Sequence, residues 1–415
     1  MTAEKKSLNT YENRLIGVLS LTFGVVFFDR QAMNFLAPFV QDDLGLSNTQ
    51  IGILASALAL TWAFSGVFFG RLCDRFGRQR LVLITAVIVF SLSSVLSGLA
   101  TSFLFLLAAR MLMGLAEGPV LPISQTVVAL ESSPERRGVN MGFMQQFGSN
   151  ILGTFLAPLV LVALATQLGW REAFYIAGIP GLICALLIWL YMRDPDPKRF
   201  SAANSEVDEK GGVTIAEGLR YRNIWLCIML SGLSIGWAIL CFVFLPLYFI
   251  NVAGFSPTKM SILMSLLGLS ALIAGVGVPW LSDRYGRKRI ILIVTIMALL
   301  VPLGIMAAGN SLLLLIPCLL IGFAATGATP LVVATIPAET LPGTRVAAII
   351  GLVLGSAEII AGLIGPLLGG IIADAFGLIG TLWLQVGFII AMLVLASLLR
   401  ETAPSKTGQL AVAQT

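Results

Sequence analysis

The stretch GRLCDRFGRQR, residues 70–80, carries the strongest indication of how this chain folds. It separates two long apolar runs, so it has to form a short polar connection between two helices. Gly77 permits a tight turn there, and Asp74 can cap a helix or pair with an arginine. A second stretch, WLSDRYGRKR at residues 280–289, repeats the same Asp–Gly–Arg spacing 209 residues later, at Asp283, Gly286 and Arg287.

A second pair of segments repeats at almost the same offset. ESSPERR at residues 131–137 is matched by ETLPGTR at residues 339–345, which lies 208 residues further along the chain. Two matched signatures at nearly one offset indicate an internal duplication. We therefore expect two halves related by an axis along the membrane normal, with the binding site near the midplane between them.

The composition is that of a membrane protein. Of 415 residues, 57% are hydrophobic and only 11% are charged, whereas about 25% charged residues is usual in soluble domains. The chain has no histidine, and its five cysteines show no metal-binding or disulfide spacing, so we expect neither a metal site nor a cofactor other than protons. Without histidine, a carboxyl group would have to exchange protons near neutral pH.

Twelve apolar runs are long enough to cross a bilayer as helices. The predicted fold class is therefore an all-α polytopic membrane protein with an N-terminal six-helix half (1–192), a charged linker (193–222) and a C-terminal six-helix half (223–415). The predicted spans cover residues 15–39, 51–70, 81–98, 103–123, 139–164, 173–192, 223–251, 257–281, 290–308, 312–336, 346–372 and 378–399.

The basic residues predict the orientation. Of 26 Lys and Arg, 22 fall in the termini and the even-numbered connections, which places both termini and the linker in the cytoplasm. The net charge of +5 therefore reports orientation, and gives no reason to expect nucleic-acid binding. The N-terminus lacks a signal-peptide pattern, so the first run should remain as a span of a plasma (inner) membrane protein.

Five charges fall inside the predicted spans: Asp29, Arg30, Arg110, Glu117 and Glu358. A charge at the bilayer centre costs about 2.5–3.5 kcal/mol on insertion scales, so such residues usually face a cavity and carry function. A rise of about 1.5 Å per residue puts Asp29 and Arg110 at a similar outer level and Glu117 deeper. We expect Asp29 to face Arg110 and Arg30 to face the cavity. The alternative is a set of structural ion pairs, which are weak stabilisers.

The duplicated loop and the six-plus-six layout resemble the major facilitator superfamily over essentially the whole chain. That resemblance implies that the loops gate the transporter by latching one of its states. The implied gating residues are Asp74, Arg75, Gly77 and Arg78 in the first copy and Asp283, Arg284, Gly286 and Arg287 in the second. The second copy has Pro279 and Trp280 where the first has Gly70, which predicts a looser second latch.

The charge pattern is similar to one branch, the anion:cation symporters, which include sugar-acid permeases, sialin and vesicular glutamate transporters. That branch has Asp-Arg in the first helix and, in the fourth, Arg with a Glu seven residues later before Gly-Pro, as in Arg110 and Glu117-Gly118-Pro119. The resemblance implies that Arg30 and Arg110 bind a carboxylate, while Asp29 and Glu117 take up protons. Arginine suits the first role because it stays charged and offers a forked donor.

Three further residues are candidates for the substrate site. Glu358 stands where the branch tends to have a neutral polar residue, so it could contact substrate, exchange a proton, or make a structural hydrogen bond. Gln146 on the fifth helix and Trp62 on the second are weaker candidates, since a lone polar residue in a membrane helix is more often an interhelical contact.

These observations favour a secondary transporter that takes up a small organic anion with protons by alternating access, acting as a monomer in the bilayer. The alternative is a proton-exchanging exporter of an amphipathic compound such as a lysolipid or drug, because spinster-type transporters share the Asp-Arg and Arg…Glu pattern. A membrane enzyme is not supported, since no nucleophile–base spacing is evident.

Overall fold

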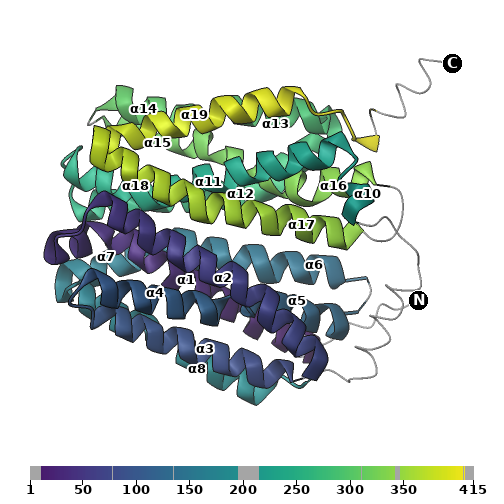
Figure 1. The fold of residues 1–415 in the computed structure, drawn as a ribbon, viewed down its shortest axis with the longest axis horizontal. Coiled ribbons are helices and arrows are strands. Elements are labelled where there is room, and N and C mark those ends of the chain that lie inside the picture. Colours follow the sequence, from purple (N-terminus) through teal and green to yellow (C-terminus); the bar gives the residue numbers. More distant parts are fainter. Residues whose placement is uncertain are drawn as a thin grey trace, which may run out of the picture. The chain divides into compact units, whose positions relative to one another are not determined.

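The computed structural model describes residues 11–76, 78–133, 135–194, 215–309, 311–341, 346–404 and 406, and in these ranges the chain forms helices and no strand (Figure 1). Twelve helical segments within them are long and apolar enough to cross a membrane, which confirms the predicted number of spans. Helices suit this setting because each satisfies its own backbone hydrogen bonds without water. Most of the predicted linker, residues 195–214, lies outside the described residues.

The chain divides into two compact units, residues 1–33 with 61–204 and residues 34–60 with 205–415. Residues 34–60, the end of the first span and the start of the second, thus group with the second unit, whereas the predicted halves place them in the first. The boundaries of the predicted halves stay a prediction.

The first unit holds the following helices, α1 and α2 being shared with the second unit: α1 (Tyr11–Leu44), α2 (Asn48–Phe76), α3 (Gln79–Gly98), α4 (Phe103–Glu117), α5 (Val120–Glu131), α6 (Arg137–Gly142), η1 (Phe143–Phe147), η2 (Ser149–Leu156), α7 (Ala157–Leu168) and α8 (Trp170–Tyr191).

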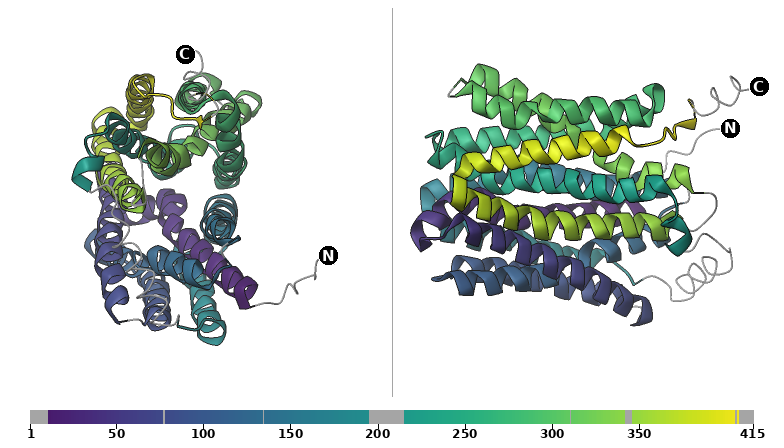
Figure 2. Two further views of the ribbon diagram at one scale, coloured as in Figure 1. Left: turned by 90° about the vertical axis from the view of Figure 1, so that its right-hand side faces the viewer. Right: turned by 45° about the horizontal axis from the view of Figure 1, so that its top comes forward.

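The second unit holds the remaining described helices: α10 (Ile215–Gly218), α11 (Arg222–Asn251), α12 (Pro257–Tyr285), α13 (Arg287–Ala298), α14 (Leu300–Ala308), α15 (Leu312–Phe323), η3 (Ala324–Ala328), η4 (Leu331–Thr335), α16 (Ile336–Thr340), α17 (Val346–Ile359), η5 (Ile360–Ile364), α18 (Gly365–Phe376) and α19 (Leu378–Ser397). In this unit α11 packs along α17 and α19 (Figure 2).

In the first unit, α3 packs along α8 and also contacts α4 (Figure 1). Small residues allow this close approach: a Cβ added at Gly178 of α8 would lie 2.7 Å from the Ser91 carbonyl oxygen of α3. One stripe of α3 consists of serines that are all buried, namely Ser91, Ser93, Ser94 and Ser97. The packing therefore holds a row of hydroxyl groups inside an apolar unit.

In the second unit, the start of α2 is tied to the end of α18. The backbone N–H groups of Asn48 and Thr49 donate to the two carboxylate oxygens of Asp374, each at 2.9 Å. About two turns further along α2, the Ser56 hydroxyl donates to the Leu363 carbonyl at 2.9 Å. Asp374 thereby satisfies two of the N–H groups that the first turn of a helix leaves without a partner.

Candidate functional site

Four of the five predicted intramembrane charges lie in the first unit, two on α1 and two on α4. The side chains of Asp29, Arg110 and Glu117 are 0%, 1% and 1% exposed, while Arg30 is half-buried. Burial of this kind is costly for a charge unless partners compensate it. The contacts of each side chain therefore decide what it can do.

Asp29 binds a serine of α3. The Ser94 hydroxyl lies 2.6 Å from Oδ1 of Asp29 and 2.9 Å from the backbone carbonyl oxygen of Phe174 on α8. Oδ2 of Asp29 is buried and has no hydrogen-bond partner within the described part of the chain. Asp29 is thus anchored through a single oxygen, at the point where α1, α3 and α8 meet.

Arg110 binds the next serine of the same stripe. Its Nη2 donates to the Ser97 hydroxyl at 2.9 Å, and its guanidinium carbon lies 5.2 Å from the centre of the Phe174 ring. Nε and Nη1 are buried and have no acceptor among the described residues. A buried guanidinium with free N–H groups can accept an incoming anion once the helices around it rearrange.

The prediction that Asp29 faces Arg110 agrees with an electrostatic interaction between them, although no direct hydrogen bond joins the two side chains in the described part of the chain. Each is hydrogen-bonded to α3 instead, through Ser94 and Ser97. The physical reason is that these two serines lie three residues apart on one face of α3, and each presents its hydroxyl to one of the charges. The concentration of four serines within residues 91–97 was the signal for this role, and the interpretation of the charges alone missed it.

Arg30 lies against aromatic rings of its own unit. Its guanidinium carbon is 5.1 Å from the Trp62 ring of α2 and 5.6 Å from the Phe27 ring of α1. Cation–π contacts of this kind hold a guanidinium without using its hydrogen-bond donors. The structure thus brings together Arg30 and Trp62, two of the residues predicted for the substrate site.

Glu117 is the last residue of α4, next to a break in the helix. Pro119 lacks a backbone N–H and interrupts the span between α4 and α5. A Cβ at Gly66 of α2 would lie 3.1 Å from the Gly118 carbonyl oxygen, so α2 approaches the chain closely at this point. Both carboxyl oxygens of Glu117 are buried without a hydrogen-bond partner in the described ranges, and the residue interacts electrostatically with Arg30.

The remaining predicted substrate residues, Gln146 and Glu358, belong to other elements of the chain. Gln146 is exposed on η1 and accepts a hydrogen bond from the Asn150 side chain at 3.1 Å. Glu358 is half-buried on α17 and belongs to the second unit. Their predicted roles stay predictions.

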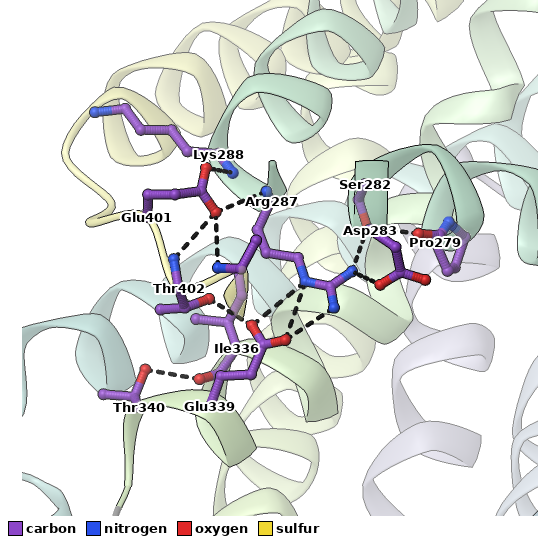
Figure 3. Close-up of polar contacts among 11 residues, drawn as sticks. Pro279, Ser282, Asp283, Arg287, Lys288, Ile336, Glu339, Thr340, Glu401 and Thr402 are labelled. Carbon is purple, nitrogen blue, oxygen red and sulfur yellow. Dashed lines mark hydrogen bonds and ion pairs between the residues drawn. The ribbon is translucent and has the colours of Figure 1, made fainter. Parts of the chain in front are cut away.

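The second copy of the duplicated loop forms a dense polar cluster (Figure 3). Arg287 donates through Nε and Nη2 to the Glu339 carboxylate, with Nη2 2.8 Å from Oε1, and through Nη1 to Asp283 and the Ser282 hydroxyl at 2.5 and 2.6 Å. Glu339 belongs to the second repeated segment, so the two sequence signatures meet here. Arg287 is fully engaged here, but the predicted looseness relative to the first copy stays a prediction, because the side chains of Asp74 and Arg75 lie outside the described residues.

The segment after α19, which contains Glu401 and Thr402, closes the same cluster (Figure 3). Oε1 of Glu401 accepts the backbone N–H of Arg287 at 2.8 Å, and Oε2 accepts that of Lys288 at 3.2 Å. Gly286 precedes them with φ +101°, a conformation that favours glycine. Arg284 instead lies over the Trp280 ring at 4.2 Å and takes no part in the cluster.

The first copy of the loop is only partly described. Asp74 and Arg75 belong to the end of α2, but their side chains lie outside the described residues, as does Gly77. Arg78 is exposed and precedes α3. The predicted gating role of this copy stays a prediction.

Comparison with known families decides the class of protein. The family model described as Major Facilitator Superfamily matches residues 19–357. The chain belongs to this superfamily. It is therefore a multi-pass membrane protein of a transporter family rather than an enzyme, as the duplicated loop predicted.

Curated relatives in the superfamily are named for organic acids. The chain is 28% identical over 397 residues to the hexuronate transporter of Bacillus subtilis, covering 88% of this chain and 89% of the relative. It is 30% identical over 306 residues to a probable 4-methylmuconolactone transporter of Cupriavidus pinatubonensis (72% and 70% covered). It is 26% identical to a probable sulfoacetate transporter of Cupriavidus necator, with 66% of this chain and 65% of the relative covered.

Solved superfamily structures share the fold. A bacterial homologue of the human lysosomal transporter Spinster, in an inward-facing and unoccupied conformation, gives a TM-score of 0.77 at 19% identity and covers 95% of this chain and 97% of its own. A D-xylose–proton symporter gives 0.76 at 17% identity, with 95% and 99% covered. At these identities the likeness concerns the fold alone.

Proposed function

We propose that this chain is a proton-coupled transporter that takes up a small organic anion by alternating access. The observation that carries the proposal is Arg110, a buried guanidinium whose Nε and Nη1 have no acceptor in the described part of the chain. Desolvation makes an unpaired cation costly, and a carboxylate that reaches those N–H groups would relieve that cost. The organic acids named for the curated relatives are of this chemical class.

Arg30 and Arg110 divide the binding of the anion in this proposal. Arg30 is half-buried and held by Trp62 and Phe27 through ring contacts that leave its donors available, so it would meet the anion first. Arg110 is fully buried and would be reached when the helices rearrange between the two access states. Two arginines that differ in burial would then bind one carboxylate in succession.

Asp29 and Glu117 are the proposed proton carriers. Both are buried carboxyl groups with at least one oxygen that has no hydrogen-bond partner among the described residues, and both interact electrostatically with the arginines. A carboxyl group that takes a proton no longer competes with the anion for an arginine, which couples the two solutes. Glu358 on α17 is a third candidate, either for exchanging a proton or for contact with the anion. The protein would need no cofactor beyond these protons, would act as a monomer, and would keep both termini in the cytoplasm of a plasma membrane.

The experiment is uptake into proteoliposomes with an imposed pH gradient, alkaline inside. A thermal-shift screen of glucuronate, 4-hydroxybenzoate, sulfoacetate, sialic acid and a lysophospholipid would first select the solute. We expect one of the acids to accumulate against its own gradient only when the pH gradient is present. Stabilisation by the lysophospholipid alone, with no acid taken up, would favour the exporter of amphipathic compounds.

The coupling role of Glu117 has its own variant. Glu117→Gln keeps the shape of the side chain but cannot exchange a proton, so it should still exchange labelled solute across the membrane without accumulating it. Glu135→Gln, at an exposed position between α5 and α6, is the matched control and should behave as wild type. Accumulation by Glu117→Gln at the wild-type level would show that this carboxyl group does not couple the proton.

A further inference from the structure

The Ser94 hydroxyl has one hydrogen, but two oxygen atoms lie within hydrogen-bond distance of it. A serine hydroxyl has one hydrogen to donate and two lone pairs that accept. Ser94 Oγ lies 2.6 Å from Asp29 Oδ1 and 2.9 Å from the Phe174 carbonyl oxygen, and both distances are typical of O–H···O hydrogen bonds. If Asp29 were ionised, both neighbours would be acceptors, and one contact would lack a hydrogen.

A neutral Asp29 removes this conflict. Its carboxyl O–H then donates to Ser94 Oγ, and the Ser94 hydroxyl donates to the Phe174 carbonyl, so each short contact holds one hydrogen. Oδ2 of Asp29 also fits the neutral form, because a buried carboxylate needs several donors and this oxygen has none in the described residues.

We propose that Ser94 is the positioning residue of the proton site: it accepts the carboxyl hydrogen of Asp29 and passes its own hydroxyl hydrogen to the Phe174 carbonyl. This structure is then the form in which Asp29 carries a proton. That this proton is coupled to transport rests on the proposed function. Its location on Asp29 rests on the contacts of Ser94 alone.

Proton loss from Asp29 would change three contacts in sequence. The O–H bond of Asp29 breaks and the proton passes to water on the side to which the site opens, so Oδ1 becomes an acceptor and the Ser94 hydroxyl has to turn away from Phe174. The ionised carboxylate then also draws Arg110, whose Nη2 is held by Ser97 one turn further along α3. Because the Phe174 ring lies against Arg110, the carbonyl and the ring of one residue connect the proton site with the proposed anion site.

The charged groups around Asp29 come from two helices. α4 supplies Arg110 and Glu117, which both interact with Asp29 electrostatically, and Arg30 follows it on α1 itself. The buried residues of α3 include no ionisable side chain, and Tyr175, the nearest ionisable residue of α8 along the chain, donates its hydroxyl to the Gly98 carbonyl at 3.2 Å. η2, which contacts α1 at Phe27, carries no ionisable residue. A change in the protonation of Asp29 therefore acts on two neighbours, Ser94 on α3 and Arg110 on α4.

Infrared spectroscopy of the purified full chain, without any solute, tests the inference directly. At neutral pH the wild type should show the C=O stretch of a protonated carboxylic acid that disappears in Asp29→Asn. In Ser94→Ala this band should move to higher frequency, because the carboxyl group loses its hydrogen-bond acceptor, and Ser94→Thr should restore it. Ser93→Ala is the matched control, since the Ser93 hydroxyl bonds only to the Val89 carbonyl of its own helix.

Two results would overturn the inference. One is an identical set of carboxylic-acid bands in wild type and Asp29→Asn, which would mean that Asp29 is ionised. The other is an unshifted Asp29 band in a folded Ser94→Ala protein, with folding checked by thermal unfolding, which would mean that Ser94 does not hold the proton. Because the infrared measurement uses no solute, its result does not depend on whether the uptake experiment succeeds. The two proposals can therefore fail separately.

Discussion

Three charged side chains of the first unit, Asp29, Arg30 and Arg110, are held by hydroxyl groups and aromatic rings rather than by direct hydrogen bonds to one another. Asp29 and Arg110 each use one atom on a serine of α3, and Arg30 lies on Trp62. A direct ion pair between Asp29 and Arg110 would satisfy both charges and make them inert towards an anion. The serine contact leaves donors available, since Ser97 contacts only Nη2 of Arg110, while Nε and Nη1 have no acceptor among the described residues.

At the residue scale, Arg110→Ala should weaken binding of the selected acid. Hydrogen bonds to charged groups contribute about 1.5–3 kcal/mol, which corresponds to roughly 10- to 150-fold in affinity. Titration of the purified protein with the acid measures this change. Met111→Ala, at the neighbouring exposed position of α4, is the control and should bind as wild type. Retained affinity in Arg110→Ala would exclude it as the anion site.

Arg287 is the second residue whose role can be measured. Arg287→Lys keeps the charge but cannot donate at once to Glu339, Asp283 and Ser282, so the protein should lose about 1.5–3 kcal/mol of stability. Thermal unfolding in detergent would show this as a lower midpoint. Arg289→Ala removes an exposed charge from the same loop and should leave the midpoint unchanged. Equal midpoints for both variants would show that the cluster contributes nothing to stability.

At the scale of elements, two helix N-termini receive carboxylates from distant parts of the sequence. Asp374 at the end of α18 accepts the first N–H groups of α2, and Glu401 accepts those of α13. A carboxylate near a helix N-terminus is stabilised by the unpaired N–H groups and by the helix dipole. These contacts join segments more than one hundred residues apart, so spacing along the chain gave no indication of them.

Removal of the Asp374 carboxylate should loosen the first turn of α2. Asp374→Ala leaves the Asn48 and Thr49 N–H groups without their acceptor, and losses of this kind cost about 0.5–2 kcal/mol. Hydrogen exchange at residues 48–52 should accelerate several-fold, while Asp42→Ala, an exposed position on α1, serves as the control. Unchanged exchange in Asp374→Ala would mean that the start of α2 is fixed by packing alone.

At the scale of the whole molecule, the distribution of Lys and Arg predicts which side of the membrane each connection faces. In a variant whose five cysteines are replaced by alanine, Arg137→Cys should react with a membrane-impermeant maleimide only after the cells are opened. Gln167→Cys, near the end of α7, should react in intact cells. Both positions are exposed, so reactivity reports topology rather than burial. The opposite labelling pattern would reverse the predicted orientation.

The sequence by itself determined the class of the protein, the number of its spans and the identity of its buried charges. Apolar runs of sufficient length can only be helices in lipid, and a charge inside such a run is too costly to be incidental. Tertiary structure alone decided which partners those charges have. Ser94 and Ser97 meet Asp29 and Arg110 because glycines such as Gly178 let α3 pack closely on α8, and that packing depends on residues about eighty positions away in the chain.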